Sequence, residues 1–172
     1  MLKEFLIASS IACLSSFACA EDLYISGAMG QSDIDLSGYD DGTSIELTVG
    51  YRAHTNYAFE ASYVDLGEFE GNSSPMLTVG YTGINFSFVG IIPVNDDVEV
   101  FAKIGKYIWD GSIDQAGSGE VAGSNSTDTS MGIGISTNIN EKFSLVLAYQ
   151  RFDVDPSMDP ITNMSIGGRY HF

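Results

Sequence analysis

The sequence predicts an all-β fold, an eight-stranded antiparallel transmembrane β-barrel, on three observations. Apolar and polar residues alternate with a period of two over most of residues 21–172, which is typical of strands rather than helices. No part of that segment holds about 18 consecutive apolar residues, so no transmembrane helix is expected. The composition, with 44% hydrophobic residues, 19 glycines, 10 phenylalanines and 9 tyrosines, suits strands joined by tight turns.

Residues 1–20 have the features of a cleaved secretory signal peptide. Lys3 lies near the amino terminus, an apolar run follows, and Ala18-Cys19-Ala20 forms a small-residue cleavage site. The alternatives are a buried N-terminal helix and a lipoprotein acylated at Cys19. Cleavage would leave residues 21–172 as one β-barrel domain without cysteine, in an oxidising compartment.

Residues 43–53 show the period-two alternation most clearly. Ile45 and Leu47 fall on one face of this segment, and Glu46 and Thr48 fall on the other. The same pattern predicts eight strands, at residues 23–31, 43–53, 57–67, 84–92, 98–109, 127–137, 142–152 and 162–172.

The predicted connections alternate between two lengths. The short ones are residues 54–56, 93–97 and 138–141. The others are longer and rich in Gly, Ser, Asp and Asn, for example residues 111–126. Residues 76–81 could instead extend the fourth strand beyond the membrane, with a bulge near Gly83. Strands near ten residues, short turns at one end and long loops at the other are typical of an outer-membrane β-barrel.

The two faces of each predicted strand decide between a membrane barrel and a soluble fold. One face carries Ile, Leu, Val, Phe, Tyr and Met, and the other mostly Gly, Ser, Thr, Asn and Ala with scattered charges. Small polar side chains suit the narrow lumen of an eight-stranded barrel, whereas a sandwich would need bulky aliphatic residues inside. A secreted sandwich or a lipocalin-like barrel is the alternative. Aromatic residues beside the short turns predict an aromatic girdle of Tyr51, Tyr57, Phe59, Phe143, Tyr170 and Phe172.

Several charged residues fall on the face predicted to line the lumen. A charge in a narrow lumen must be paired, so we expect ion pairs between side chains at similar depth. Glu46 is also on this face. The predicted lumen ion-pair network consists of Arg52, Glu60, Glu99, Lys103 and Arg169.

The last eight residues, SIGGRYHF, carry the most specific short motif. Ser165, Gly167, Tyr170 and Phe172 follow a polar-x-Gly-x-x-aromatic-x-aromatic pattern that ends with the chain. It resembles the signal by which the outer-membrane assembly machinery recognises its barrel substrates. The pattern also fits a last strand whose alternate residues face lipid, and both roles can hold together.

Residues 50–67 and 90–110, together with the closing GGRYHF, resemble the transmembrane domain of outer membrane protein A and its small-barrel relatives. The resemblance implies an eight-stranded barrel with both termini in the periplasm. The sequence ends at Phe172, so we do not expect the peptidoglycan-binding domain that many members append.

The same resemblance bears on whether the lumen of the barrel conducts ions. The family has a buried ion-pair gate, and Glu60 matches its acidic member, but Val89 and Ala148 stand at other gate positions. This departure favours a structural plug over a weakly conducting gate.

The composition and the positions of the histidines argue against two functions, nucleic-acid binding and lipid A modification. A formal net charge of −16 excludes nucleic acid as an expected partner, because binding a phosphate backbone needs a basic face. Outer-membrane lipid A-modifying enzymes use His and Ser at the outer rim, but His54 and His171 are both predicted at the short-turn end. We expect no enzymatic activity and no cofactor.

Most acidic residues lie in or beside the predicted long loops. Asp33, Asp35 and Asp41 match positions of a calcium-binding loop, but Ser44 replaces its final Glu, so a divalent-ion site competes with an ordinary solvated loop. Arg151, near the outer end, could meet a lipopolysaccharide phosphate.

The sequence therefore predicts an integral bacterial outer-membrane protein that displays acidic loops, with a structural, adhesion or host-interaction role. A small ion-conducting pore is the first alternative and a lipid A-modifying enzyme the second. The expected partners are outer-membrane lipid and lipopolysaccharide, the assembly machinery, and a host surface.

Overall fold

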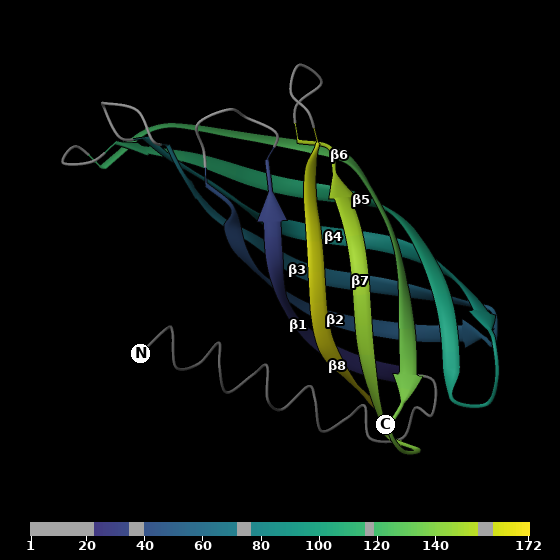
Figure 1. Ribbon diagram of the computed structural model, residues 1–172. Helices are drawn as coiled ribbons and strands as arrows, with labels where there is room; N and C mark the ends of the chain where they lie inside the picture. The colour runs from purple at the N-terminus through teal and green to yellow at the C-terminus, as the bar shows by residue number, and fades with distance from the viewer. Residues whose placement is uncertain (1–22, 35–39, 72–76, 116–118, 155–159) are drawn as a thin grey trace, which may run out of the picture.

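The computed structural model describes residues 23–34, 40–71, 77–115, 119–154 and 160–172, and these form a closed barrel of eight antiparallel strands (Figure 1). The predicted fold class is confirmed. The predicted signal peptide, residues 1–20, lies outside the described residues. The strands are β1 Leu23–Asp33, β2 Gly42–His54, β3 Tyr57–Glu70, β4 Leu77–Pro93, β5 Val98–Gln115, β6 Gly119–Asn138, β7 Phe143–Phe152 and β8 Ile161–His171.

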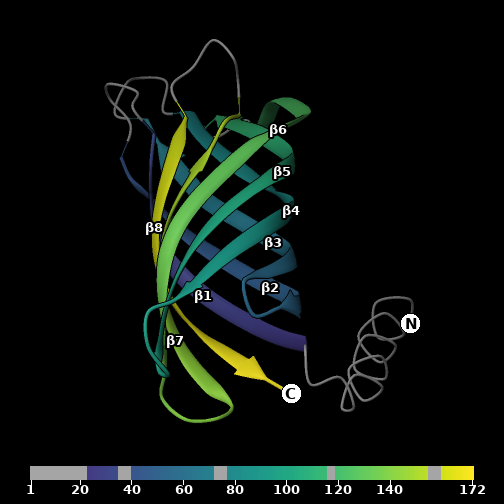
Figure 2. The ribbon, with the colours of Figure 1, turned by 90° about the vertical axis from the view of Figure 1, so that its right-hand side faces the viewer.

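The barrel closes because β1 pairs with both β2 and β8. The β1–β8 ladder runs from Tyr24 opposite His171 to Asp33 opposite Thr162. Closure satisfies the backbone groups of every strand and leaves no sheet edge, which a membrane-spanning sheet requires. The start of β1 and the carboxyl end of the chain lie at the same end of the barrel as the short turns (Figure 2).

Asparagine side chains build two of the short turns. The Asn95 Oδ1 accepts hydrogen bonds from the backbone N–H groups of Asp97 and Val98, at 2.9 and 2.8 Å. The Asn140 Oδ1 accepts equivalent bonds from Lys142 and Phe143, at 2.9 and 3.0 Å. Asn is favoured in turns because its side chain can bond to its own backbone two or three residues on.

β4 begins at Leu77, which confirms the alternative that residues 76–81 extend it, and β5 and β6 also extend well beyond their predicted bounds. β5 continues to Gln115 and β6 begins at Gly119, so most of residues 111–126 pair as strands rather than forming a loop. These residues are small and polar and show no clear alternation. Pairing between the strands satisfies their backbone groups, and this tertiary effect overrides their weak propensity.

A bulge lies on β3 rather than near Gly83 on β4, where it was predicted. Asp65 pairs with Thr82 and Glu68 with Gly80, so the two residues between Asp65 and Glu68 face a single residue of β4. One of them, Gly67, has φ +82°, which L side chains rarely adopt.

A belt of exposed apolar side chains surrounds the barrel. It includes Met29, Ile45, Leu47, Val49, Phe59, Tyr63, Ile84, Phe86, Ile104, Ile108, Met131, Ile133, Leu145, Tyr149, Met164 and Ile166, which are 40 to 69% exposed. No described helix is long and apolar enough to cross a membrane. A continuous apolar belt on a closed barrel is typical of strands that face lipid.

The inside of the barrel is more apolar than predicted. Near the outer end, where the long loops attach, a cluster of buried apolar side chains fills the lumen, and we call it the outer plug. Its members are Ile34, Val64, Leu66, Phe69, Tyr81, Tyr107, Trp109, Phe152, Val154 and Ile161. A smaller cluster near the short-turn end contains Tyr24, Ala58, Val89, Ile91 and Phe101.

Candidate functional site

Four charged side chains meet in the lumen, and we call them the lumen ion cluster: Glu46, Glu60, Lys103 and Arg169. The Lys103 Nζ lies 2.6 Å from the Glu60 Oε2 and 3.8 Å from the Glu46 Oε1. An Arg169 guanidinium nitrogen lies 3.6 Å from the Glu60 Oε1. The side chains of this cluster are at most 9% exposed, so two carboxylates balance two cations that are largely removed from bulk solvent.

The predicted network of five residues is divided into two groups. Arg52 and Glu99 form a separate pair nearer the short turns, with nitrogen–oxygen distances of 2.6 and 3.2 Å. Arg52 also donates to the backbone carbonyl of Thr55 at 2.8 Å. The side chains of this pair are 23% and 16% exposed, so solvent screens them more than the lumen ion cluster.

Neutral side chains complete the lumen ion cluster, and the sequence analysis did not identify them. The Tyr24 hydroxyl donates to the Glu60 Oε1 at 2.6 Å, and the Gln150 Nε2 donates to the Glu46 Oε2 at 2.6 Å. The Arg169 guanidinium carbon lies 4.4 Å from the centre of the Tyr24 ring. Tyr24 and Gln150 belong to the inward faces of β1 and β7, so strand phase was the signal that could have found them.

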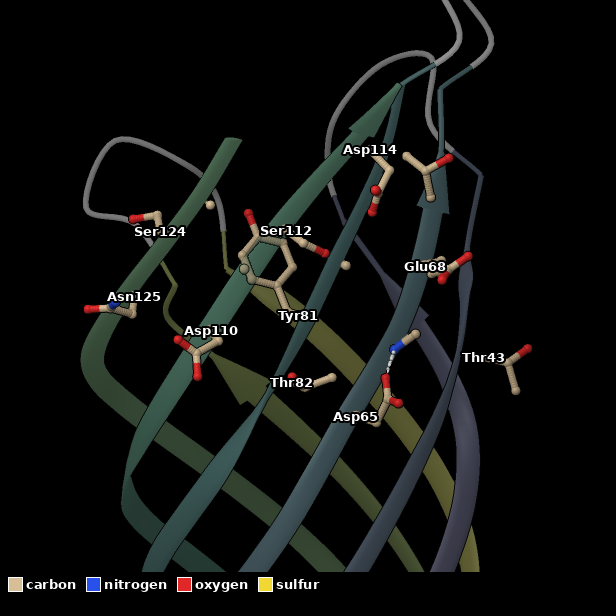
Figure 3. A pocket seen from close by; sticks show the side chains of 15 residues that line it. Thr43, Asp65, Glu68, Tyr81, Thr82, Asp110, Ser112, Asp114, Ser124 and Asn125 are labelled. Atoms are coloured by element: carbon tan, nitrogen blue, oxygen red, sulfur yellow. Dashed lines mark hydrogen bonds between the residues drawn. The ribbon is translucent and has the colours of Figure 1, made fainter. Parts of the chain in front are cut away.

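A second polar site lies at the outer end, where the outward faces of β3, β4, β5 and β6 form a groove of about 450 Å³. Four carboxylates line it, and we call it the acidic groove: Asp65, Glu68, Asp110 and Asp114. Figure 3 shows Thr82 lying between Asp65 and Asp110.

Strand register explains how the acidic groove forms. Thr82 pairs with Asp65 on one side and with Asp110 on the other, so these carboxylates occupy one row across three strands. At the usual strand spacing they stand about 10 Å apart. In the next row, Gly80 separates Glu68 from Ser112. Small residues between the carboxylates keep the floor of the groove low.

The described residues supply no counter-charge to the acidic groove. In the part of the chain that the structure describes, none of its four carboxylates makes an ion pair. The Asp65 Oδ1 accepts a hydrogen bond from the Gly67 N–H at 2.8 Å, which supports the bulge (Figure 3). The groove therefore presents a concentrated negative potential to the solvent.

The predicted divalent-ion loop is only partly described. Asp33 ends β1 and is exposed, and Asp41 accepts a hydrogen bond from the Gln31 side chain at 2.5 Å, while Asp35 lies outside the described residues. Among the residues that are described, no group of three or more His, Cys, Asp or Glu side chains could hold a metal ion.

Two cations point outward near the top of the apolar belt. Lys106 lies between Ile104 and Ile108 on the outward face of β5, and its Nζ donates to the Thr129 Oγ1 at 3.2 Å. Arg151 on β7 is exposed and forms a 3.2 Å ion pair with Asp153. Both cations therefore lie on the outward face of the barrel.

Both histidines lie at the short-turn end. The His54 ring stacks on Tyr57 with 5.3 Å between ring centres. The His171 Nε2 lies 3.1 Å from the Ser144 Oγ, which also donates to the Asn138 Oδ1 at 2.7 Å. Neither histidine lies near the outer rim.

The C-terminal motif places its residues on both faces of β8. Ser165 is buried in the lumen, and a Cβ at Gly167 would collide with the Ala28 side chain and with β1 backbone. The Tyr170 ring packs edge-on against Phe143 and Phe172, with ring centres 5.0 and 5.2 Å apart. Gly167 thus permits close packing of β8 against β1, while the aromatic residues join the girdle.

Comparison with known proteins agrees with this architecture. A family model described as the outer membrane protein beta-barrel domain matches residues 5–172. The chain belongs to this family. This outer-membrane β-barrel protein is thus a small barrel of the bacterial outer membrane, as its resemblance to outer membrane protein A-like barrels predicted.

Solved structures share the fold of this outer-membrane β-barrel protein. It is similar to Neisserial surface protein A, with a TM-score of 0.66, 18% identity, and 87% of this chain and 96% of that chain covered. OprG from Pseudomonas aeruginosa has a TM-score of 0.63 at 13% identity, with 89% and 97% covered. Ail, the attachment invasion locus protein of Yersinia pestis, has a TM-score of 0.58 at 15% identity, with 88% and 97% covered. No curated protein sequence matches this chain.

Proposed function

We propose that this outer-membrane β-barrel protein presents the acidic groove to the cell exterior as a contact surface for a cationic partner, such as a basic segment of a host-surface protein. The observation that carries the proposal is the set of four carboxylates around one groove, without an ion pair in the described part of the chain. A ligand with several positive charges could contact more than one of these carboxylates at once.

The partner that we propose for this protein has the opposite charge to a ligand of Ail, a protein with the same fold. Ail has been crystallised with the heparin analogue sucrose octasulfate, which is a polyanion. A chain with a net charge of −16 and an acidic groove is suited to the opposite charge. The proposed role is adhesion or host interaction, and it requires no catalysis and no cofactor.

The lumen supports contact at the surface over conduction. The outer plug and the lumen ion cluster both occupy the interior, and a void of about 20 Å³ beside the lumen ion cluster has room for only one or two waters. We therefore place the small-pore alternative second.

Binding of a fluorescent hexalysine peptide tests the acidic groove. The double variant Asp110→Asn with Asp114→Asn should weaken binding roughly 3- to 10-fold, because each exposed charge pair contributes up to about 1 kcal/mol. Binding should also fall with added salt. The control is Asp96→Asn with Asp97→Asn, which removes the same number of charges from exposed residues in a short turn at the other end of the barrel. An equal loss in the control would show that net charge, rather than the groove, attracts the peptide.

We also propose that Lys106 and Arg151 contact phosphate groups of lipopolysaccharide. Arginine suits phosphate through paired hydrogen bonds, and Lys106 is a cation within the apolar belt, where a phosphate could reach it.

Thermal unfolding in detergent with added lipopolysaccharide tests this contact. Lipopolysaccharide should raise the Tm of the wild type, and Lys106→Gln with Arg151→Gln should lose at least half of that increase. Lys142→Gln at the opposite end is the control and should keep it. An unchanged increase in the double variant would contradict the contact.

A further inference from the structure

A hollow lies on the lipid-facing surface where β1 and β8 close the barrel. Two adjoining depressions of about 460 and 550 Å³ share four lining residues, and we call the combined feature the seam groove. The shared residues are Gly27, Leu47, Phe143 and Gly168. The seam groove belongs neither to the acidic groove nor to the lumen.

Strand register shows why the surface is hollow there. Gly27 of β1 pairs directly with Gly168 of β8, and this pair lies in one row between Leu47 of β2 and Leu145 of β7. Side chains surround the two glycines on the outward face, and the ring of Tyr170 stands in the neighbouring row. The row that contains Gly27 and Gly168 therefore has no side chains on its two middle strands, and a leucine stands on either side.

The fold does not require glycine at either position. A Cβ at Gly168 would meet no atom within 4 Å, and a Cβ at Gly27 would meet only the Leu47 side chain at 3.6 Å. Neither has a positive φ. By contrast, a Cβ at Gly167 would collide with β1 backbone. Glycine within a strand lowers stability by roughly 0.5–1 kcal/mol relative to alanine. Because packing does not require glycine here, we attribute the glycine pair to the hollow that it leaves in the surface.

A cation stands at the end of the seam groove nearest the short turns. The Lys142 Nζ lies 5.8 Å from the centre of the Tyr170 ring, which lines the groove. Lys142 is exposed and makes no ion pair among the described residues. Each of the other described cations either lies in the lumen region or points outward near the outer rim.

We propose that the seam groove binds one glycerophospholipid of the periplasmic leaflet. One acyl chain lies over Gly27 and Gly168, between the flanking leucines, and the phosphate lies at the Lys142 ammonium. Short turns of outer-membrane barrels face the periplasm, so Lys142 stands at the height of the headgroups of that leaflet. The charges are complementary: on a chain of net charge −16, the anionic phosphate finds an unpaired cation beside an apolar groove.

Native mass spectrometry of the refolded protein in micelles doped with phosphatidylglycerol tests the proposal. We expect the wild type to retain one lipid and Gly168→Leu to retain at least fivefold less, because the new side chain fills the groove. The matched control is Gly90→Leu, since Gly90 also faces outward and its Cβ would meet only a backbone oxygen at 4.0 Å. Both variants should fold, which a heat-modifiable electrophoretic band checks.

The headgroup contact is tested separately with diacylglycerol, which has the acyl chains but no phosphate. Lys142→Gln should lower phosphatidylglycerol retention several-fold and leave diacylglycerol retention unchanged, while Glu141→Gln in the same turn should lower neither. Equal lipid retention by Gly168→Leu and Gly90→Leu would overturn the proposal. A dimer mass that Gly168→Leu abolishes, with no retained lipid in the wild type, would overturn it in favour of a second copy of the chain as occupant.

Discussion

Replacing Glu60 by Gln is expected to lower the free energy of unfolding by about 3–5 kcal/mol, the usual cost of breaking a buried ion pair. Glu60 pairs with both Lys103 and Arg169, and its own side chain is only 1% exposed. Gln has nearly the same shape and still accepts the hydrogen bond from Tyr24. The loss should therefore come from leaving Arg169 without a carboxylate partner and Lys103 with only Glu46, at 3.8 Å.

Urea unfolding in lipid vesicles, followed by the fluorescence of Trp109, measures this loss, because the chain has a single tryptophan and it is buried. Glu99→Gln is the matched control. It breaks the more exposed pair with Arg52 and should cost about 1 kcal/mol or less. Similar losses in the two variants would mean that the lumen ion cluster is no more sensitive than a solvated pair.

Truncating Phe152 to Ala is expected to cost about 3–5 kcal/mol, because it leaves a cavity in the outer plug. Phe152 is fully buried, and its ring centre lies 4.9 Å from that of Tyr107. Phe143→Ala on the same strand is the control. The Phe143 side chain is 50% exposed on the lipid-facing surface, so lipid can fill the space that its ring leaves.

The same variant tests whether the lumen is closed. Because the outer plug and the lumen ion cluster lie in series, opening one of them should not open the barrel. We expect no steady conductance in planar bilayers from the wild type or from Phe152→Ala. A sizeable steady channel in the wild type would contradict a closed lumen and favour the pore alternative. Equal destabilisation by Phe152→Ala and Phe143→Ala would contradict the structural role of the outer plug.

Period-two alternation predicted the membrane-spanning part of the fold well. In β2, Ile45, Leu47 and Val49 face outward and Glu46 and Thr48 face inward, as their spacing indicated. The reason is that a strand reverses its side chains at every residue, so one register places a whole face in lipid.

Features that depend on neighbouring strands could not be predicted from local pattern. The bulge lies on β3, where Gly67 adopts a positive φ and Asp65 accepts a hydrogen bond from its N–H, but its place in the sheet follows from the register with β4. The outer plug was missed because the apolar residues change face near the outer end: Phe152 and Ile161 point inward, whereas along most of each strand the apolar residues point outward. Predicted charges such as Glu60 and Lys103 do meet, but the division of the network into two groups follows from strand tilt and depth.

The extension of β5 has a thermodynamic consequence for recognition. Asp110 and Asp114 stand on a paired strand, so their backbone is already ordered before any partner arrives. Ordering a free segment costs roughly 1–2 kcal/mol per residue, and a binding surface built on loops pays that cost on association. The proposed binding to the acidic groove would avoid most of that cost, so a short basic ligand would need fewer contacts to bind there.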